Sequence, residues 1–170
     1  GAVAAMTAAL TSPYDVTGAA HLPRGAEGPE TLIRVEGFAP SVAYRAGRLK
    51  ELLGHRGEAG LELLEGAAAE APWPAIRDAR PFAGREGAVW RVSLKPSDAP
   101  HLLAALPEAE AFLDQGGGLV WLLVGEGADA HAPAIREALA PLGGHATLVR
   151  AAPATRAAVP VFEPQPAPVE

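Results

Sequence analysis

The chain has 170 residues, of which 49% are hydrophobic, and this suits one compact domain with its own core. Its formal net charge of −6 comes without a dense lysine and arginine cluster, which argues against a nucleic-acid partner. It contains no cysteine, so it offers no disulfide, thiolate nucleophile or cysteine-bound metal. No uninterrupted apolar run reaches the roughly eighteen residues that a membrane span needs, and the first residues lack the basic segment of a signal peptide. We therefore expect a cytoplasmic protein without membrane insertion.

The first half predicts a mixture of helices and strands. Alternating apolar residues in TLIRVEG are typical of a half-buried strand, and Pro40 suits the first turn of a helix. In chain order we expect a helix at 3–10, a strand at 14–22, a connection at 23–29, a strand at 31–37, a helix at 40–53, a strand at 61–65 and a helix broken by prolines at 67–83, anchored by Trp73, Ile76 and Phe82.

The second half gives a more regular pattern. The apolar run LVWLLV indicates a central strand, with Trp121 in the core, and Ser97 is expected to cap a helix. The predicted elements are a strand at 89–94, a helix at 97–106, a strand at 109–113, a turn at 115–118, a strand at 119–124, a helix at 132–142 and a strand at 145–150. We expect residues 1–152 to form one domain and 153–170 an extended, proline-rich tail.

The order of elements predicts an α+β fold. Residues 88–150 read β-α-β-β-α-β, the ferredoxin-like split βαβ order, and the first half reads the same without its opening strand. The tripeptides Ala39-Pro40-Ser41 and Lys95-Pro96-Ser97, each opening a helix, favour a duplication. We therefore expect duplicated ferredoxin-like halves in one mainly antiparallel sheet, with helices on one face.

Polar residues within apolar strands are the candidate site residues. In VWRVSL, Arg91 lies on the face opposite Trp90, and a buried guanidinium needs a partner or a cavity. Arg91 therefore either lies on a solvated sheet face or binds a carboxylate in a cavity, and Trp90 either packs in the core or shields such a pocket. Arg34 has the same ambiguity, with Glu36 available to neutralise it. His145 is either a structural strand-entry residue or a group that orients a substrate.

No histidine spacing places two imidazoles on one metal, and neither glycine-rich stretch matches a phosphate-binding motif. We therefore expect no metal, and we interpret the stretches at 115–118 and 125–127 as turns.

Six stretches, in order along the chain, resemble the E subunits of bacterial glycolate oxidase, a branch of the FAD-linked oxidase family of the vanillyl-alcohol-oxidase type. They are SPYDVTGAAHLP (12–23), TLIRVEGFAPSV (31–42), VWRVSLKPSDAP (89–100), GGGLVWLLV (116–124), GGHATLVRA (143–151) and VPVFEPQPAP (159–168). The resemblance implies a C-terminal cap domain that covers the flavin and forms the substrate pocket, within an enzyme that oxidises glycolate to glyoxylate.

The resemblance also implies a cofactor and partners. The sequence contains no flavin-domain glycine motif, so FAD would be bound mainly by a domain outside this chain. The partners would be a second flavin subunit and an iron–sulfur subunit, and the complex could lie at the inner membrane. By the same resemblance Arg91, which follows Trp90, matches an arginine that contacts the substrate carboxylate. The alternatives are a stand-alone ferredoxin-like ligand-binding domain and a subunit-interaction domain.

Overall fold

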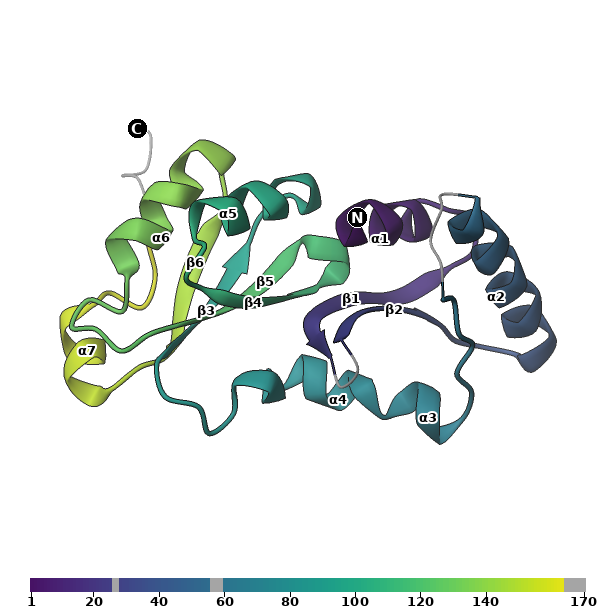
Figure 1. Ribbon diagram of the computed structural model, residues 1–170, viewed down its shortest axis with the longest axis horizontal. Coiled ribbons are helices and arrows are strands. Elements are labelled where there is room, and N and C mark those ends of the chain that lie inside the picture. Colours follow the sequence, from purple (N-terminus) through teal and green to yellow (C-terminus); the bar gives the residue numbers. More distant parts are fainter. Residues whose placement is uncertain (26–27, 56–59, 164–170) are drawn as a thin grey trace, which may run out of the picture.

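The computed structural model describes residues 1–25, 28–55 and 60–163 and shows one six-stranded sheet with helices around it (Figure 1). The strand order is β2-β1-β4-β5-β3-β6, and every neighbouring pair is antiparallel. The strands are β1 (Val16–Gly25), β2 (Gly28–Val35), β3 (Ala88–Ser93), β4 (Glu110–Asp114), β5 (Leu119–Val124) and β6 (His145–Arg150). The predicted α+β fold with an antiparallel sheet is thereby confirmed.

The helices follow most of the predicted positions. They are α1 (Ala2–Leu10), α2 (Ala39–Gly54), α3 (Ala67–Glu70), α4 (Pro72–Arg77), α5 (Ala99–Ala105), α6 (Ala132–Leu139) and α7 (Pro153–Ala158), with 3-10 turns η1 (Arg80–Phe82), η2 (Pro96–Asp98), η3 (Gln115–Gly117) and η4 (Ala140–Leu142). The helix expected at 67–83, with breaks at Pro72 and Pro74, is broken at Pro72, which starts α4, whereas Pro74 lies within the first turn of α4 and does not break it.

The C-terminal half has the split βαβ connection order. Strand β5 is antiparallel to both β3 and β4, so β3 and β4 are parallel, and α5 joins them across β5. In the same way α6 joins β5 to β6 across β3. This is the order predicted for residues 88–150. The first half contributes two described strands, β1 and β2, so a ferredoxin-like duplication stays a prediction.

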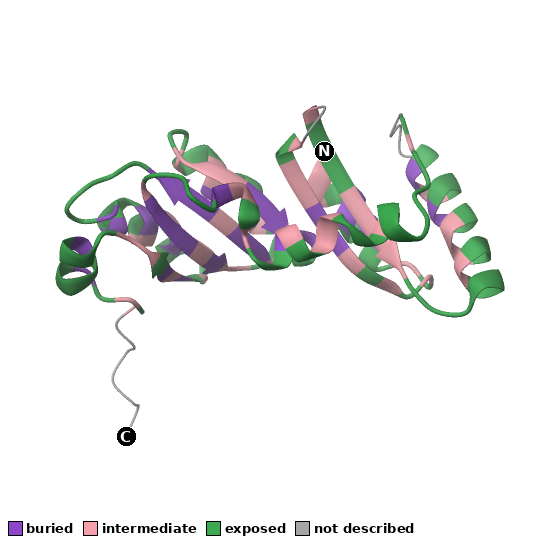
Figure 2. Ribbon diagram, turned by 90° about the horizontal axis from the view of Figure 1, so that it is seen from below, coloured by how far each residue is buried: buried purple, intermediate pink, exposed green. Residues whose placement is uncertain are grey.

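One face of the sheet carries the main core, beneath α1, α5 and α6 (Figures 1 and 2). Trp90 is fully buried at its centre, and its indole Nε1 donates a hydrogen bond to the Ala130 carbonyl at 2.9 Å. Met6 from α1 and Ile135 from α6 are also fully buried there. Burying a side chain of this size contributes about 1.5–3 kcal/mol, so this layer dominates the stability of the fold.

The opposite face is partly covered by α4 and η1, so the helices do not lie on one face only, as we expected. Ile76 of α4 and Phe82 of η1 pack with Phe112 and Val89 in a second apolar cluster. The Phe82 and Phe112 rings lie 5.3 Å apart. Because this cluster covers only part of its face, the rest of the face remains open beside it.

Two sequence-based expectations are wrong about strands. Residues 61–65 form no strand, and Leu63 is 61% exposed. The connection expected at 23–29 is instead strand over most of its length, because β1 extends to Gly25 and β2 begins at Gly28. Residues 26 and 27 of that connection lie outside the described residues. The prolines at 23 and 29 are tolerated within these strands.

Two expectations about helix ends are also corrected. Ser97 caps no helix: it lies within η2, which Pro96 starts, and its Oγ contacts Asp98 Oδ1 at 3.4 Å. The extended tail expected from residue 153 instead begins with α7. Val159 beyond it is buried, and the Leu148 amide donates a hydrogen bond to the Val161 carbonyl at 2.9 Å. Residues 153–163 therefore pack against β6, and the tail beyond 163 lies outside the described residues.

Candidate functional site

A groove lies at the seam between the two halves of the sheet. Strands β1 and β4 share one register pair, His21 with Leu113, whereas the other neighbouring strands pair over most of their length. Beside that pair the surface is hollowed by about 770 Å³, between α4 and strands β1, β2, β3 and β5. Arg34, Arg91, Trp73 and Trp121 line this hollow, which we call the seam groove.

Arg91 enters the groove from the middle of β3. It lies between Trp121 on β5 and Thr147 on β6, on the face of the sheet opposite Trp90. The residue is half-buried, and its guanidinium has neither an ion pair nor a hydrogen bond within the part of the chain that the structure describes. None of its nitrogen atoms is among the buried atoms that lack a partner, so Arg91 keeps solvent contact and is available to an anion.

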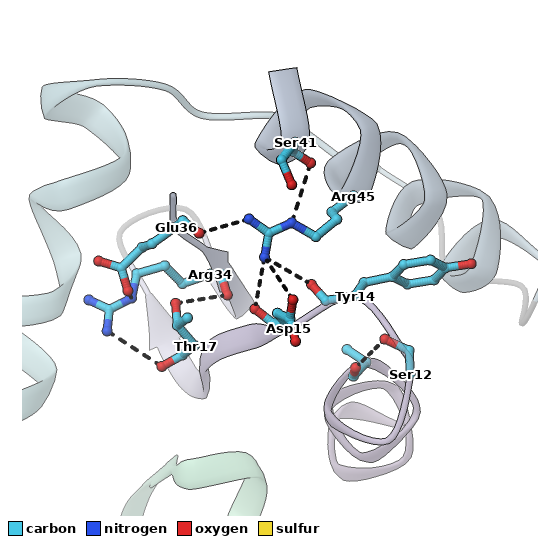
Figure 3. A network of polar contacts seen from close by, with 9 residues as sticks. Ser12, Tyr14, Asp15, Thr17, Arg34, Glu36, Ser41 and Arg45 are labelled. Atoms are coloured by element: carbon cyan, nitrogen blue, oxygen red, sulfur yellow. Dashed lines mark hydrogen bonds and ion pairs between the residues drawn. The ribbon is translucent and has the colours of Figure 1, made fainter. Parts of the chain in front are cut away.

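Arg34 reaches the same groove from β2, with its side chain 34% exposed. Its Nε lies 3.1 Å from Glu36 Oε2, as an ion pair rather than an aligned hydrogen bond, and its Nη2 lies 3.5 Å from the Thr17 carbonyl (Figure 3). The guanidinium also stacks 4.6 Å from the centre of the Trp73 ring. The expected neutralisation of Arg34 by Glu36 is thus confirmed, so Arg34 is less available to a ligand than Arg91.

Two tryptophans form the apolar walls. Trp73 of α4 rests on Gly18 of β1, where an added Cβ would lie 2.9 Å from the ring, so a side chain there would displace it. Trp121 stacks on Phe112 with a centroid distance of 6.1 Å, and its buried Nε1 has no hydrogen-bond partner among the described residues. Trp121 was expected in the core, but it lines the groove because it is the cross-strand neighbour of Arg91.

The groove carries charged side chains of both signs. Its charged side chains are Arg34, Arg77, Arg91, Glu70 and Asp114. Arg77 Nε pairs with Asp78 Oδ1 at 2.7 Å, and this hydrogen bond lowers the pKa of the Asp78 carboxyl. Asp114 accepts a hydrogen bond from the Gln115 amide at 2.7 Å. Of the three arginines, Arg91 is the one without a carboxylate partner in the described parts of the chain.

The structure brings two of the four predicted site residues together and leaves two apart. Arg91 and Arg34 share the seam groove, whereas Trp90 lies in the core on the other face, so the interpretation of Trp90 as a pocket shield is wrong. The strict alternation of side chains along β3 makes this unavoidable, because neighbours point to opposite faces. His145 is exposed at the first residue of β6 and does not line the groove.

The glycine-rich stretch after β4 is a turn rather than a cradle for phosphate. Gly116 and Gly117 adopt positive φ angles of 70° and 100°, which only glycine adopts readily. An added Cβ at Gly116 would collide with Leu10 of α1, so the turn is packed against the domain. This turn therefore provides no seat for the pyrophosphate of a dinucleotide such as FAD.

An arginine that sequence reasoning overlooked stands next to this site. Arg45 of α2 has an 11% exposed side chain and donates hydrogen bonds to the carbonyls of Glu36 at 2.8 Å and Ser41 at 3.3 Å (Figure 3). Further hydrogen bonds reach the carbonyls of Tyr14 at 3.5 Å and Asp15 at 3.4 Å. Arg45 thus fastens α2 to the ends of both N-terminal strands, and no spacing in the sequence signals these long-range backbone partners.

Comparisons of the chain with protein-family models, with curated proteins and with solved structures found no match. Within the described residues no group of three or more histidine or acidic side chains could hold a metal ion. None of the described helices is both long and apolar enough to cross a membrane. The seam groove is therefore the candidate functional site of the chain.

Proposed function

We propose that this chain is the substrate-binding cap of an FAD-dependent 2-hydroxy-acid oxidase subunit of the glycolate oxidase type. The observation that supports it is the half-buried, unpaired guanidinium of Arg91 in a groove walled by tryptophans. A guanidinium presents two parallel N–H donors that match the two oxygens of a carboxylate. Glycolate and related 2-hydroxy acids are small enough for the groove and carry such a carboxylate.

The residues of the chain would bind and orient the substrate. Arg91 would fix the carboxylate, and the ring of Trp121 would exclude water from one side. Arg34, held against Trp73 and paired with Glu36, would form part of the other wall. FAD, held by another domain, would supply the oxidising power by accepting a hydride from the substrate. We expect the chain alone to have no oxidase activity.

The same proposal extends to partners and location. The resemblance of the six sequence stretches supports a complex with a second flavin subunit and an iron–sulfur subunit, which would carry the electrons onward. The sequence has no dense cluster of lysine and arginine, so we propose no nucleic-acid partner. The complex would act in the cytoplasm or at the inner surface of the membrane through its other subunits.

The test is a titration of the chain with glycolate, followed by the indole N–H signal of Trp121 in two-dimensional NMR. We expect a shift with a Kd of about 1 mM or weaker, because the flavin side of the pocket is missing. Arg91→Ala should weaken binding at least about tenfold, equivalent to about 1.4 kcal/mol, and Arg91→Lys should recover part of it. The Trp121 signal is assigned with Trp121→Phe.

A matched control removes a guanidinium elsewhere. Arg24→Ala deletes a 79% exposed arginine that does not line the groove, and it should leave the titration unchanged. A Trp121 signal that is insensitive to glycolate, or equal affinities for the parent and Arg91→Ala, would remove the groove from consideration. Micromolar binding by the isolated chain would instead identify a stand-alone ligand-binding domain.

A further inference from the structure

The chain after α7 lies as an extended segment along the outer edge of the sheet. Strand β6 ends the sheet on this side, where β3 is its neighbour. In residues 159–163, which we call the edge segment, covered and exposed side chains alternate as they do in a strand. Val159 and Val161 are the covered ones at its start, and Pro160 and Phe162 are exposed.

The carbonyl groups of the edge segment are held from two opposite sides. The Leu148 amide of β6 donates a hydrogen bond to the Val161 carbonyl at 2.9 Å. From α6, Arg136 Nη2 donates to the carbonyls of Pro160 at 2.7 Å and Phe162 at 3.3 Å. Successive carbonyls of an extended chain point in opposite directions, so this pattern fits a segment that lies between β6 and Arg136.

Arg136 is committed to the edge segment rather than to a carboxylate. It forms no ion pair within the part of the chain that the structure describes. Its guanidinium lies 5.8 Å from the centre of the Trp90 ring, and its Nε is buried without a partner among the same residues. Because water does not reach this Nε, the carbonyls that Nη2 binds are the main polar contacts of the guanidinium.

The edge segment ends the sheet without offering a new edge. Val159 belongs to the main core and anchors the start of the segment. Pro160 has no N–H, and in an extended chain this group would point to the same side as the Pro160 carbonyl, away from β6. A proline on an outer strand is one of the means by which proteins prevent edge-to-edge pairing.

The β6 edge itself would be open without this cover. Its sequence, HATLVR, contains the β-branched residues Thr147 and Val149, and Val149 is 42% exposed. The Leu148 amide would lose the Val161 carbonyl as its acceptor. A strand edge with free N–H groups and apolar side chains is a template for another strand.

We propose that the edge segment is a guard: Arg136 holds it on β6, and it keeps β6 from pairing with the β6 strand of a second copy. Two such strands related by a two-fold axis would pair antiparallel, as all neighbouring strands of this sheet do. The edge segment shows that β6 accepts an extended chain at this place. The inference concerns β6 and α6 and does not depend on the ligand of the seam groove.

Hydrogen exchange of the full 170-residue chain tests the hold of Arg136. Arg136→Ala removes the donor from two carbonyls, so the Leu148 amide should exchange at least about tenfold faster than in the parent. The Leu122 amide, on a strand paired on both sides, reports global unfolding. A Leu148 amide that gains no more than the Leu122 amide would overturn the role of Arg136.

Two further variants separate release of the segment from a general loss of stability. Val159→Ala loosens the anchor in the core and leaves Arg136 in place, so it should also speed exchange at Leu148. Arg156→Ala is the matched control, because this exposed arginine of α7 has no ion pair among the described residues. It should leave the Leu148 amide as protected as in the parent, and faster exchange in this control would contradict the proposal.

Sedimentation at increasing protein concentration tests the consequence for assembly. Arg136→Ala should form a larger species than the parent at equal concentration, because the released edges pair, and Arg156→Ala should not. Adding Val149→Lys to Arg136→Ala places a charge at an exposed position of β6 and should restore the behaviour of the parent. If Arg136→Ala frees the Leu148 amide but sediments like the parent, or if Val149→Lys leaves the association unchanged, the guarding role is wrong.

Discussion

The two halves of the sheet are stabilised by different means. In the C-terminal half α5 and α6 cover four paired strands, and Trp90 and Ile135 are fully buried between the layers. In the N-terminal half α2 buries only Leu49 and Leu53, and the hydrogen bonds of Arg45 fasten it to β1 and β2. Helices with similar apolar patterns are therefore buried to different extents, and the helices that lie over paired strands contribute most to the core.

The largest expected effect comes from removing the centre of the C-terminal core. Trp90→Ala leaves a large cavity and an unpaired Ala130 carbonyl, so we expect a loss of about 3–5 kcal/mol in the free energy of unfolding. Denaturant unfolding followed by circular dichroism measures it. Trp73→Ala, at a partly buried ring in the groove, should cost clearly less. Equal losses for the two substitutions would contradict the contrast between the halves.

The next largest effect is expected from breaking the hydrogen bonds by which Arg45 attaches α2 to β1 and β2. Arg45→Ala removes donors from several backbone carbonyls, so the free energy of unfolding should fall by about 2 kcal/mol. Arg45→Lys should restore little of it, because one ammonium cannot reach all these acceptors. Arg48→Ala, on the same helix and paired at the surface with Glu51 and Tyr14, should leave the free energy of unfolding nearly unchanged. If Arg48→Ala costs as much as Arg45→Ala, the role given to Arg45 is wrong.

The smallest effect concerns the ion pairs of Glu110, of which the one with Arg24 crosses the seam between β4 and β1. Glu110 of β4 accepts from Arg85 Nη1 at 2.9 Å and from Arg24 Nη1 of β1 at 3.0 Å. The Arg85 hydrogen bond, aided by the charge of Arg24, lowers the pKa of the Glu110 carboxyl. Its stabilisation is therefore present above the pKa of the unfolded carboxyl and is lost as the pH falls through the lower, folded value.

Glu110→Gln should accordingly lower the free energy of unfolding by less than about 1 kcal/mol at pH 7. The difference between variant and parent should disappear in acid, since both then lack the charge. Unfolding curves at pH 7 and at acidic pH measure this, and Glu137→Gln on α6, with no ion pair among the described residues, is the control. A difference that persists unchanged in acid would exclude the ionic explanation.

The sequence predicted elements well where local patterns decide. The strands at 119–124 and 145–150 match β5 and β6 residue for residue, because LVWLLV is a continuous apolar run and HATLVR follows directly on the turn at Gly143-Gly144. Residues 61–65 have a strand-like composition but pair with no strand among the described residues. Strand pairing is a long-range property, which no local pattern contains.

The candidate site was predictable only in part. Alternation along VWRVSL placed Arg91 and Trp90 on opposite faces, and this already implied that both could not line one pocket. The aromatic walls instead come from Trp121, opposite Arg91 on the next strand, and Trp73, which sits on Gly18. Such contacts between distant segments arise from tertiary packing, so the sequence alone could not assign them.

The single register pair at the seam has a mechanical consequence for the groove. Arg34 belongs to β2 on one side of the seam, and Arg91 belongs to β3 on the other. The distance between the two guanidinium groups therefore depends on how β1 pairs with β4, and not on either half of the sheet alone. Because Arg34 is paired with Glu36, Arg91 is the arginine that would bind an anion, and the pairing of β1 with β4 decides how far the opposite wall stands from it.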